Sequence, residues 1–91
     1  MLRLAEGVRT THDGDGGVLL NIRHGQMFTL NIVGSQILRM LERGWSENKI
    51  VEEISSKFGI RSDIVERDVR EFLDCLQKHR LVEFHRGTGT T

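Results

Sequence analysis

The chain has 91 residues, 37% hydrophobic and 29% charged, which is enough for one domain with a single core but short for a core plus a deep catalytic cleft. Basic and acidic residues number 13 each, so the formal charge is zero, which argues against nucleic acid or an acidic membrane as the main partner. A single cysteine excludes an internal disulfide, and the sequence lacks a signal peptide or membrane span, so we expect a cytoplasmic protein.

The first third of the chain predicts three strands. Leu4 to Thr11 is rich in Thr and Val and is typical of an edge strand, and the Asp-Gly run His12 to Gly17 predicts a turn. Two further strands are expected at Val18 to Arg23 and Gln26 to Leu30, joined by His24-Gly25 as a two-residue turn.

A hairpin closed by His24 and Gly25 places apolar side chains on both faces of the sheet. The expected pairs are Ile22 with Met27 and Leu20 with Thr29 on one face, and Leu19 with Leu30 and Asn21 with Phe28 on the other. Helices packed on one side of a small sheet account for only one of these faces.

The hydrophobic period changes after Leu30 and predicts two helices. Asn31 is a good N-cap for a helix that ends at Gly44, and Ser46 is a good N-cap for a second that ends at Gly59. Each has an apolar stripe at helical spacing. The stripes are Val33, Ile37, Leu38 and Leu41 in the first helix, and Ile50, Val51, Ile54 and Phe58 in the second.

A third helix is expected to begin with a capping box formed by Asp63 and Glu66. Its predicted buried stripe is Val65, Val69, Phe72 and Leu76, with Leu73 just off it on a flank shared with Glu66, Arg70 and Gln77. We expect Leu81 to Phe84 to form a short strand or coil, residues 1–86 to form one domain, and residues 87–91 to be a flexible tail. The predicted fold is α+β and winged-helix-like, a three-stranded antiparallel sheet followed by three helices.

Metal and cofactor sites are not expected. Cys75, His79 and His85 are too few and too loosely spaced for a structural zinc, and Cys75 is better explained as a buried or half-buried helix residue. The run "DGDGG" fails as a calcium loop, because Gly17 and His24 stand where ligands are needed. No P-loop or dinucleotide fingerprint is present.

The sequence offers little support for catalysis or DNA binding. No nucleophile elbow is present, and the carboxylates alternate with basic residues as on a solvated helix face. The second and third predicted helices resemble a helix-turn-helix, but basic and acidic residues balance on the third, which does not give the basic excess that phosphates require.

The strand Gln26 to Leu30 is an edge strand if the three strands follow in sequence order, and neither Pro nor a charge protects it. One explanation is that the third helix simply covers this edge. The other is that the edge captures an extended peptide as an added strand.

The stretch "DGGVLLNIRHGQMFTLNIVGSQILRML" resembles the PqqD-like proteins, which are peptide-recognition domains of ribosomal peptide biosynthesis. The matching positions are Leu19, Leu20, Gly25, Phe28, Leu30, Asn31 and Gly34, and the resemblance runs from about Val8 to Glu83. It departs from the family pattern at Met27, where an aromatic residue is common, and at His79-Arg80, where a Gly often stands.

The resemblance implies that the leader segment of a precursor peptide adds beside Gln26, Met27, Phe28, Thr29 and Leu30. It also implies that the peptide lies against the third helix near Val69, Arg70, Leu73, Leu76 and Gln77. Asn31 and Gly34 are interpreted as structural, a helix cap and a close-packing position.

The implied function is a non-catalytic peptide chaperone that presents the leader to a modifying enzyme, such as a radical SAM protein or a leader peptidase. Cofactor quinone and lasso peptide pathways both use such domains. The alternatives are a winged-helix DNA-binding regulator and a small structural subunit of an enzyme. A homodimer through the same strand edges also stays open.

Overall fold

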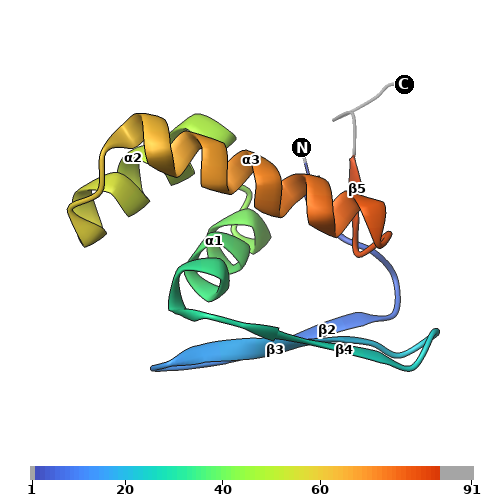
Figure 1. The fold of residues 1–91 in the computed structure, drawn as a ribbon. Coiled ribbons are helices and arrows are strands. Elements are labelled where there is room, and N and C mark those ends of the chain that lie inside the picture. The colour runs from blue at the N-terminus through green and yellow to red at the C-terminus, as the bar shows by residue number, and fades with distance from the viewer. Residues whose placement is uncertain (1, 85–91) are drawn as a thin grey trace.

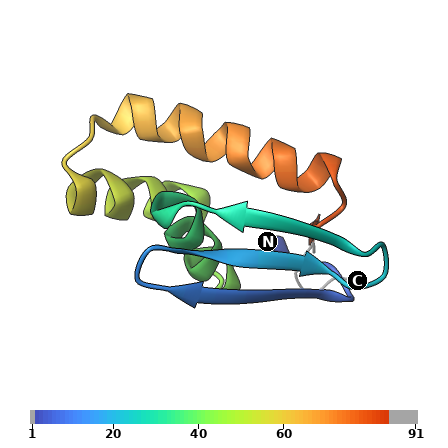
Figure 2. The same ribbon diagram turned by 60° about the horizontal axis from the view of Figure 1, so that its bottom comes forward.

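The computed structural model describes residues 2–84, and the tail predicted at residues 87–91 lies outside them. The three helices lie on one side of a three-stranded antiparallel sheet, and α1 packs directly on it, as Figures 1 and 2 show. This confirms the α+β class and the order of three strands followed by three helices. The sheet order is β2 (Val8–Asp13), β3 (Gly16–Asn21), β4 (Gln26–Leu30), and the helices are α1 (Ile32–Glu42), α2 (Glu47–Phe58) and α3 (Ser62–Lys78).

The N-terminal strand differs from the prediction. The segment Leu4 to Thr11 is broken at Gly7, whose φ of +85° is outside the strand region, and the Val8 amide donates to the Ala5 carbonyl across the turn. Before the turn, β1 (Leu2–Leu4) pairs with β5 (Val82–Phe84) as a separate two-stranded sheet. The two strands at the ends of the described chain therefore lie side by side, with β1 against α1 and β5 against α3.

The predicted turn His12 to Gly17 is also shorter than expected. Only Gly14 and Asp15 form it, and β3 begins at Gly16 instead of Val18. A Cβ on Gly16 would collide with the Leu30 carbonyl, which explains why a strand can begin on two glycines: the neighbouring backbones leave no room for side chains.

The β3–β4 hairpin has a different register from the predicted one. Leu20 pairs with Met27 and Leu19 with Phe28, because the loop spans the four residues 22–25 and not His24-Gly25 alone. The Asn21 side chain accepts a hydrogen bond from the His24 amide at 3.3 Å, which stabilises the wider loop. The shift is an even number of residues, so each side chain stays on its predicted face.

The two faces of the sheet have different environments. On the inner face Leu19 is fully buried under α1, and Leu30 is buried beside it. On the outer side Leu20, Ile22 and Met27 are 38%, 61% and 69% exposed, so no element among residues 2–84 covers them.

The helix ends follow the predicted caps at four of five positions. The Asn31 side chain accepts from the Gly34 amide at 2.7 Å and the Ser46 side chain from the Lys49 amide at 3.2 Å. Gly44 and Gly59 adopt positive φ at the helix C-termini. The predicted capping box of α3 is wrong, because Asp63 accepts from the adjacent Ile64 amide and pairs with Arg61.

The buried face of α3 is rotated from its predicted position. Leu73, placed just off the stripe by its spacing, is 4% exposed and belongs to the core with Val65, Val69 and Leu76. Phe72, predicted in the stripe, is only partly buried at the edge of that core. None of the helices described is long and apolar enough to cross a membrane.

Candidate functional site

Strand β4 is an open edge of the sheet, since it pairs with β3 alone among the described residues. The Leu30 carbonyl lies against Gly16 of β3, so Leu30 directs its backbone groups into the sheet. Because an antiparallel ladder alternates, Met27 and Thr29 direct their N–H and C=O groups to the open side. Figure 2 shows this edge facing α3.

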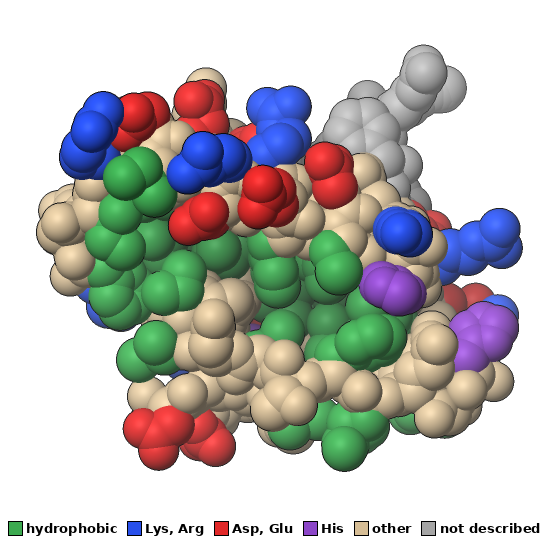
Figure 3. All heavy atoms as spheres, viewed as in Figure 1, with side chains coloured by type: hydrophobic (Ala, Val, Ile, Leu, Met, Phe, Trp, Pro, Cys, Tyr) green, Lys and Arg blue, Asp and Glu red, His purple; other side chains and the backbone are tan. Residues whose placement is uncertain are grey.

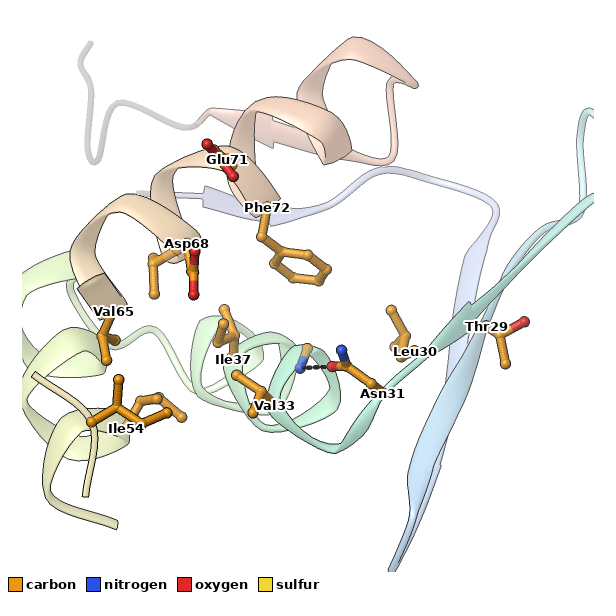
Figure 4. Close-up of a pocket in the computed structure, with 13 residues that line it drawn as sticks. Thr29, Leu30, Asn31, Val33, Ile37, Ile54, Val65, Asp68, Glu71 and Phe72 are labelled. Atoms are coloured by element: carbon orange, nitrogen blue, oxygen red, sulfur yellow. Dashed lines mark hydrogen bonds between the residues drawn. The ribbon is translucent and has the colours of Figure 1, made fainter. Parts of the chain in front are cut away.

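A groove of about 520 Å³ begins where β4 ends and continues between α1 and α3 (Figure 4). Figure 3 shows it as a hollow lined by hydrophobic side chains between the helical layer and the sheet. Its lining residues are Thr29, Leu30, Asn31, Val33, Gly34, Ile37, Ile54, Ile60, Val65, Asp68, Val69, Glu71 and Phe72. We use "the groove" for this set.

Gly34 and Phe72 set the width of the groove. Phe72 points from α3 toward the start of α1, and a Cβ added to Gly34 would lie 3.4 Å from its Cε1 atom. The distance to Phe72 is an ordinary van der Waals contact, and the tighter approach is to Asn31 Oδ1 at 3.3 Å, so Gly34 packs closely against the helix cap. Gly34 and the helix cap Asn31 also line the groove, so these structural positions form part of its surface.

Of the ten predicted site residues, the groove contains Thr29, Leu30 and Val69. On β4, Gln26 and Met27 are exposed, and the Phe28 ring lies 5.4 Å from the ring of His79 at the end of α3. Whether the ten residues bind a peptide stays a prediction.

The four remaining predictions on α3 do not face the groove. Arg70 turns toward α2 and pairs with Glu47 at 3.0 Å. Leu73 and Leu76 are buried in the core, and Gln77 is exposed outside the groove. The α3 wall of the groove comes instead from Val65, Asp68, Val69, Glu71 and Phe72. Apart from Val69, these residues were predicted to lie in the core or on a solvated face.

Ten of the thirteen groove residues were not predicted as site residues, and Phe72, Asp68 and Ile60 are three of them. Phe72 was assigned to the core and Asp68 to a solvated face. Ile60 stands in the short link after Gly59 and packs against the core from there. The sequence did contain a signal for Ile60. An apolar residue directly after the glycine that ends a helix often packs back against that helix and the core beside it.

A Ser–His–Glu set on β2 and α1 is structural. His12 Nδ1 lies 2.5 Å from Ser35 Oγ, and His12 Nε2 lies 3.5 Å from Glu42 Oε1. Ser35 is 2% exposed and donates to the Gly16 carbonyl at 3.2 Å, so its hydroxyl cannot reach a substrate. The set fastens the β2–β3 hairpin to α1.

The weak metal set cannot be assembled from the described residues, because His85 lies outside them. Cys75 was expected to be buried or half-buried and is exposed on α3 instead. Within residues 2–84 no three side chains of the ligating types come together.

The family model of coenzyme PQQ synthesis protein D (PqqD) matches residues 16–82. The chain belongs to the PqqD family. The match begins at the first residue of β3 and ends within β5, so it contains β4, all three helices and every residue that lines the groove.

Two solved structures share the fold at a TM-score of 0.84. TbiB1 in complex with the TbiA(beta) leader peptide is 34% identical, over 92% of this chain and 98% of that one. A lasso peptide synthetase B1 complexed with a leader peptide is 23% identical, over 91% and 98%, and supports the fold alone. Comparison with curated protein sequences found no match.

Proposed function

We propose that this PqqD-family protein binds the leader segment of a ribosomal precursor peptide by adding it as a strand to β4, and presents it to a modifying enzyme without catalysing a reaction. The observation that carries the proposal is the unpaired β4 edge opening directly into the groove. Main-chain bonds to Met27 and Thr29 would give affinity, and side chains entering the groove would give specificity.

The relative of higher identity supports this function over the alternatives. TbiB1 is 34% identical and is in complex with a leader peptide, which is the class of ligand proposed here. For a DNA-binding regulator, α3 would have to present an excess of basic side chains, but its basic residues are outnumbered by acidic ones, and Arg70 is paired with Glu47. The enzyme partner, a radical SAM protein or a leader peptidase, and the cytoplasmic location belong to the same proposal.

Isothermal titration calorimetry tests the proposal with two probes, the TbiA(beta) leader peptide and the precursor encoded beside this gene. Thr29→Pro removes an outward amide from β4 while leaving its ladder to β3, so it should weaken leader binding at least tenfold. The matched control is Thr10→Pro. Thr11 directs its carbonyl to Gly17, so Thr10 faces outward on the opposite edge, β2.

Thermal melts of both variants separate binding from folding. Strand addition at β4 predicts that Thr10→Pro retains affinity even though it also loses the hydrogen bond that the Thr10 hydroxyl donates to Glu42. Equal losses of affinity and stability in the two variants would mean that the β4 edge is only structural. Absence of leader binding at high micromolar concentration, together with salt-sensitive binding of duplex DNA, would favour the regulator.

A further inference from the structure

The side of the groove formed by α3 combines apolar residues with two carboxylates at its solvent-exposed border. Asp68 and Glu71 line it beside Val65 and Phe72, and Figure 4 shows the Asp68 carboxylate pointing from α3 toward the space above α1. In Figure 3 acidic side chains follow the upper border of the hydrophobic hollow. A ligand in this groove therefore meets a carboxylate as well as an aromatic ring.

Neither carboxylate has an ionic partner among residues 2–84. The basic residues Arg61 and Arg70 of the same segment are engaged elsewhere, with Asp63 and with Glu47 of α2. Arg67 stands one turn before Glu71 on the exposed face and partly offsets that charge, so Asp68 is the stronger candidate for an external partner.

The opposite end of the groove is acidic too. Gly17 pairs with Leu30, which places the β2–β3 turn beside the end of β4 where the groove begins. Asp13 at the end of β2 and Asp15 in the turn are both exposed, and acidic side chains are visible there at the lower left of Figure 3. Both borders of the groove mouth thus have the same sign of charge.

Peptide binding would remove water from the carboxylates that border the groove, and this desolvation has a free-energy cost. A peptide that fills the groove removes water from Asp68, and a charged group that loses water without gaining a partner costs affinity. A cationic side chain on the peptide removes that cost and adds a charge-assisted hydrogen bond. The N-terminus of α1 carries positive partial charge on the other side, so a cation would lie toward α3.

We infer that the bound peptide carries a lysine or arginine at the position that lies against Asp68, with Glu71 as a second contact. The inference rests on the proposed leader-binding function and names one feature of the sequence that this protein selects. An acidic residue at the same peptide position would be rejected.

A positional scan tests it. Each position of the TbiA(beta) leader peptide is replaced in turn by Lys and by Glu, and affinity is measured by fluorescence anisotropy for the wild type, Asp68→Asn and Asp74→Asn. Asp74 is the matched control, because it is exposed on the same helix but does not line the groove.

In the wild type we expect one position, or two neighbouring ones, at which Lys binds about tenfold tighter than Glu. Asp68→Asn should reduce this preference to about twofold, Asp74→Asn should leave it unchanged, and added salt should diminish it. The Asp68 side chain is exposed and has no hydrogen-bond or ionic partner among residues 2–84, so circular dichroism should show an unaltered fold.

Two results overturn the inference while leaving the proposed function intact: leader binding with no Lys preference at any position, and a preference that persists in Asp68→Asn. If neither the peptides of the scan nor the precursor encoded beside this gene bind, the proposed function fails and the inference fails with it.

Discussion

Leu73 and Phe72 are neighbours on α3 with different environments, and alanine substitutions should separate them. Leu73 is 4% exposed and belongs to the core, whereas Phe72 is partly buried and lines the groove. Leu73→Ala should therefore cost stability, and Phe72→Ala should chiefly cost peptide binding.

The magnitude for Leu73 follows from its burial. Replacing a fully buried leucine with alanine costs about 2 to 5 kcal/mol, and we take about 3 because a surface helix relaxes partly into the cavity. A domain of this size is stabilised by roughly 5 to 14 kcal/mol in total, so a large share is lost. With a urea m-value of about 1.5 kcal/mol/M, the unfolding midpoint should fall by about 2 M.

Urea titration followed by Trp45 fluorescence measures this change. Trp45 is partly buried against the core and its ring lies 4.3 Å from Lys49 Nζ, so its emission should respond to unfolding. Phe72→Ala should lower the midpoint by less than half as much and weaken binding of the TbiA(beta) leader peptide about tenfold or more. A larger midpoint loss in Phe72→Ala than in Leu73→Ala would refute the assigned orientation of α3.

Two other substitutions test the ends of β3 and α1. Gly16→Ala should destabilise the protein by about 2 to 4 kcal/mol, because the φ of Gly16 is +148° and an added Cβ would meet the Leu30 carbonyl. Gly14→Ala is the control, since a Cβ there meets no atom within 4 Å. Similar melting temperatures for the two variants would contradict the close approach at Gly16. Asn31→Ala should cost about 1 kcal/mol through the lost bond to the Gly34 amide, measured by urea titration, and Asn31→Asp should restore most of it. Equal losses in Ala and Asp would show that the cap does not matter.

The helices were predictable because their signals are local. Asn31, Ser46 and Gly59 each act within one turn of their own position, and the structure places each in its predicted cap. The apolar period between these caps needs no knowledge of the rest of the chain. The failed capping box at Asp63 shows the limit, since Arg61 competes for that carboxylate.

The orientation of α3 was not predictable from its own sequence. Phe72 and Leu73 are adjacent, so they lie about 100° apart on the helix, on either side of the line through Val65, Val69 and Leu76. Which of the two flanks is buried depends on where α2 packs against α3. That packing is a tertiary contact, which the sequence of α3 alone does not reveal. The groove wall was misplaced for the same reason, because Arg70 lies on the α2 flank and pairs with Glu47.

The hairpin register was missed for a different reason. The His24-Gly25 pair resembles a two-residue turn, and the sequence gives no sign that Asn21 is buried with its side chain bonded to the His24 amide. The strands at the two chain ends have three residues each, too few to form a recognisable alternation.

Amide hydrogen exchange at Met27 and Thr29 tests the central claim, that a peptide adds as a strand to β4. In the free protein these two outward amides should exchange rapidly, while the Phe28 amide, directed to β3, is protected. With saturating TbiA(beta) leader peptide, Met27 and Thr29 should become protected by at least tenfold. Binding of the peptide with unchanged exchange at both amides would contradict strand addition.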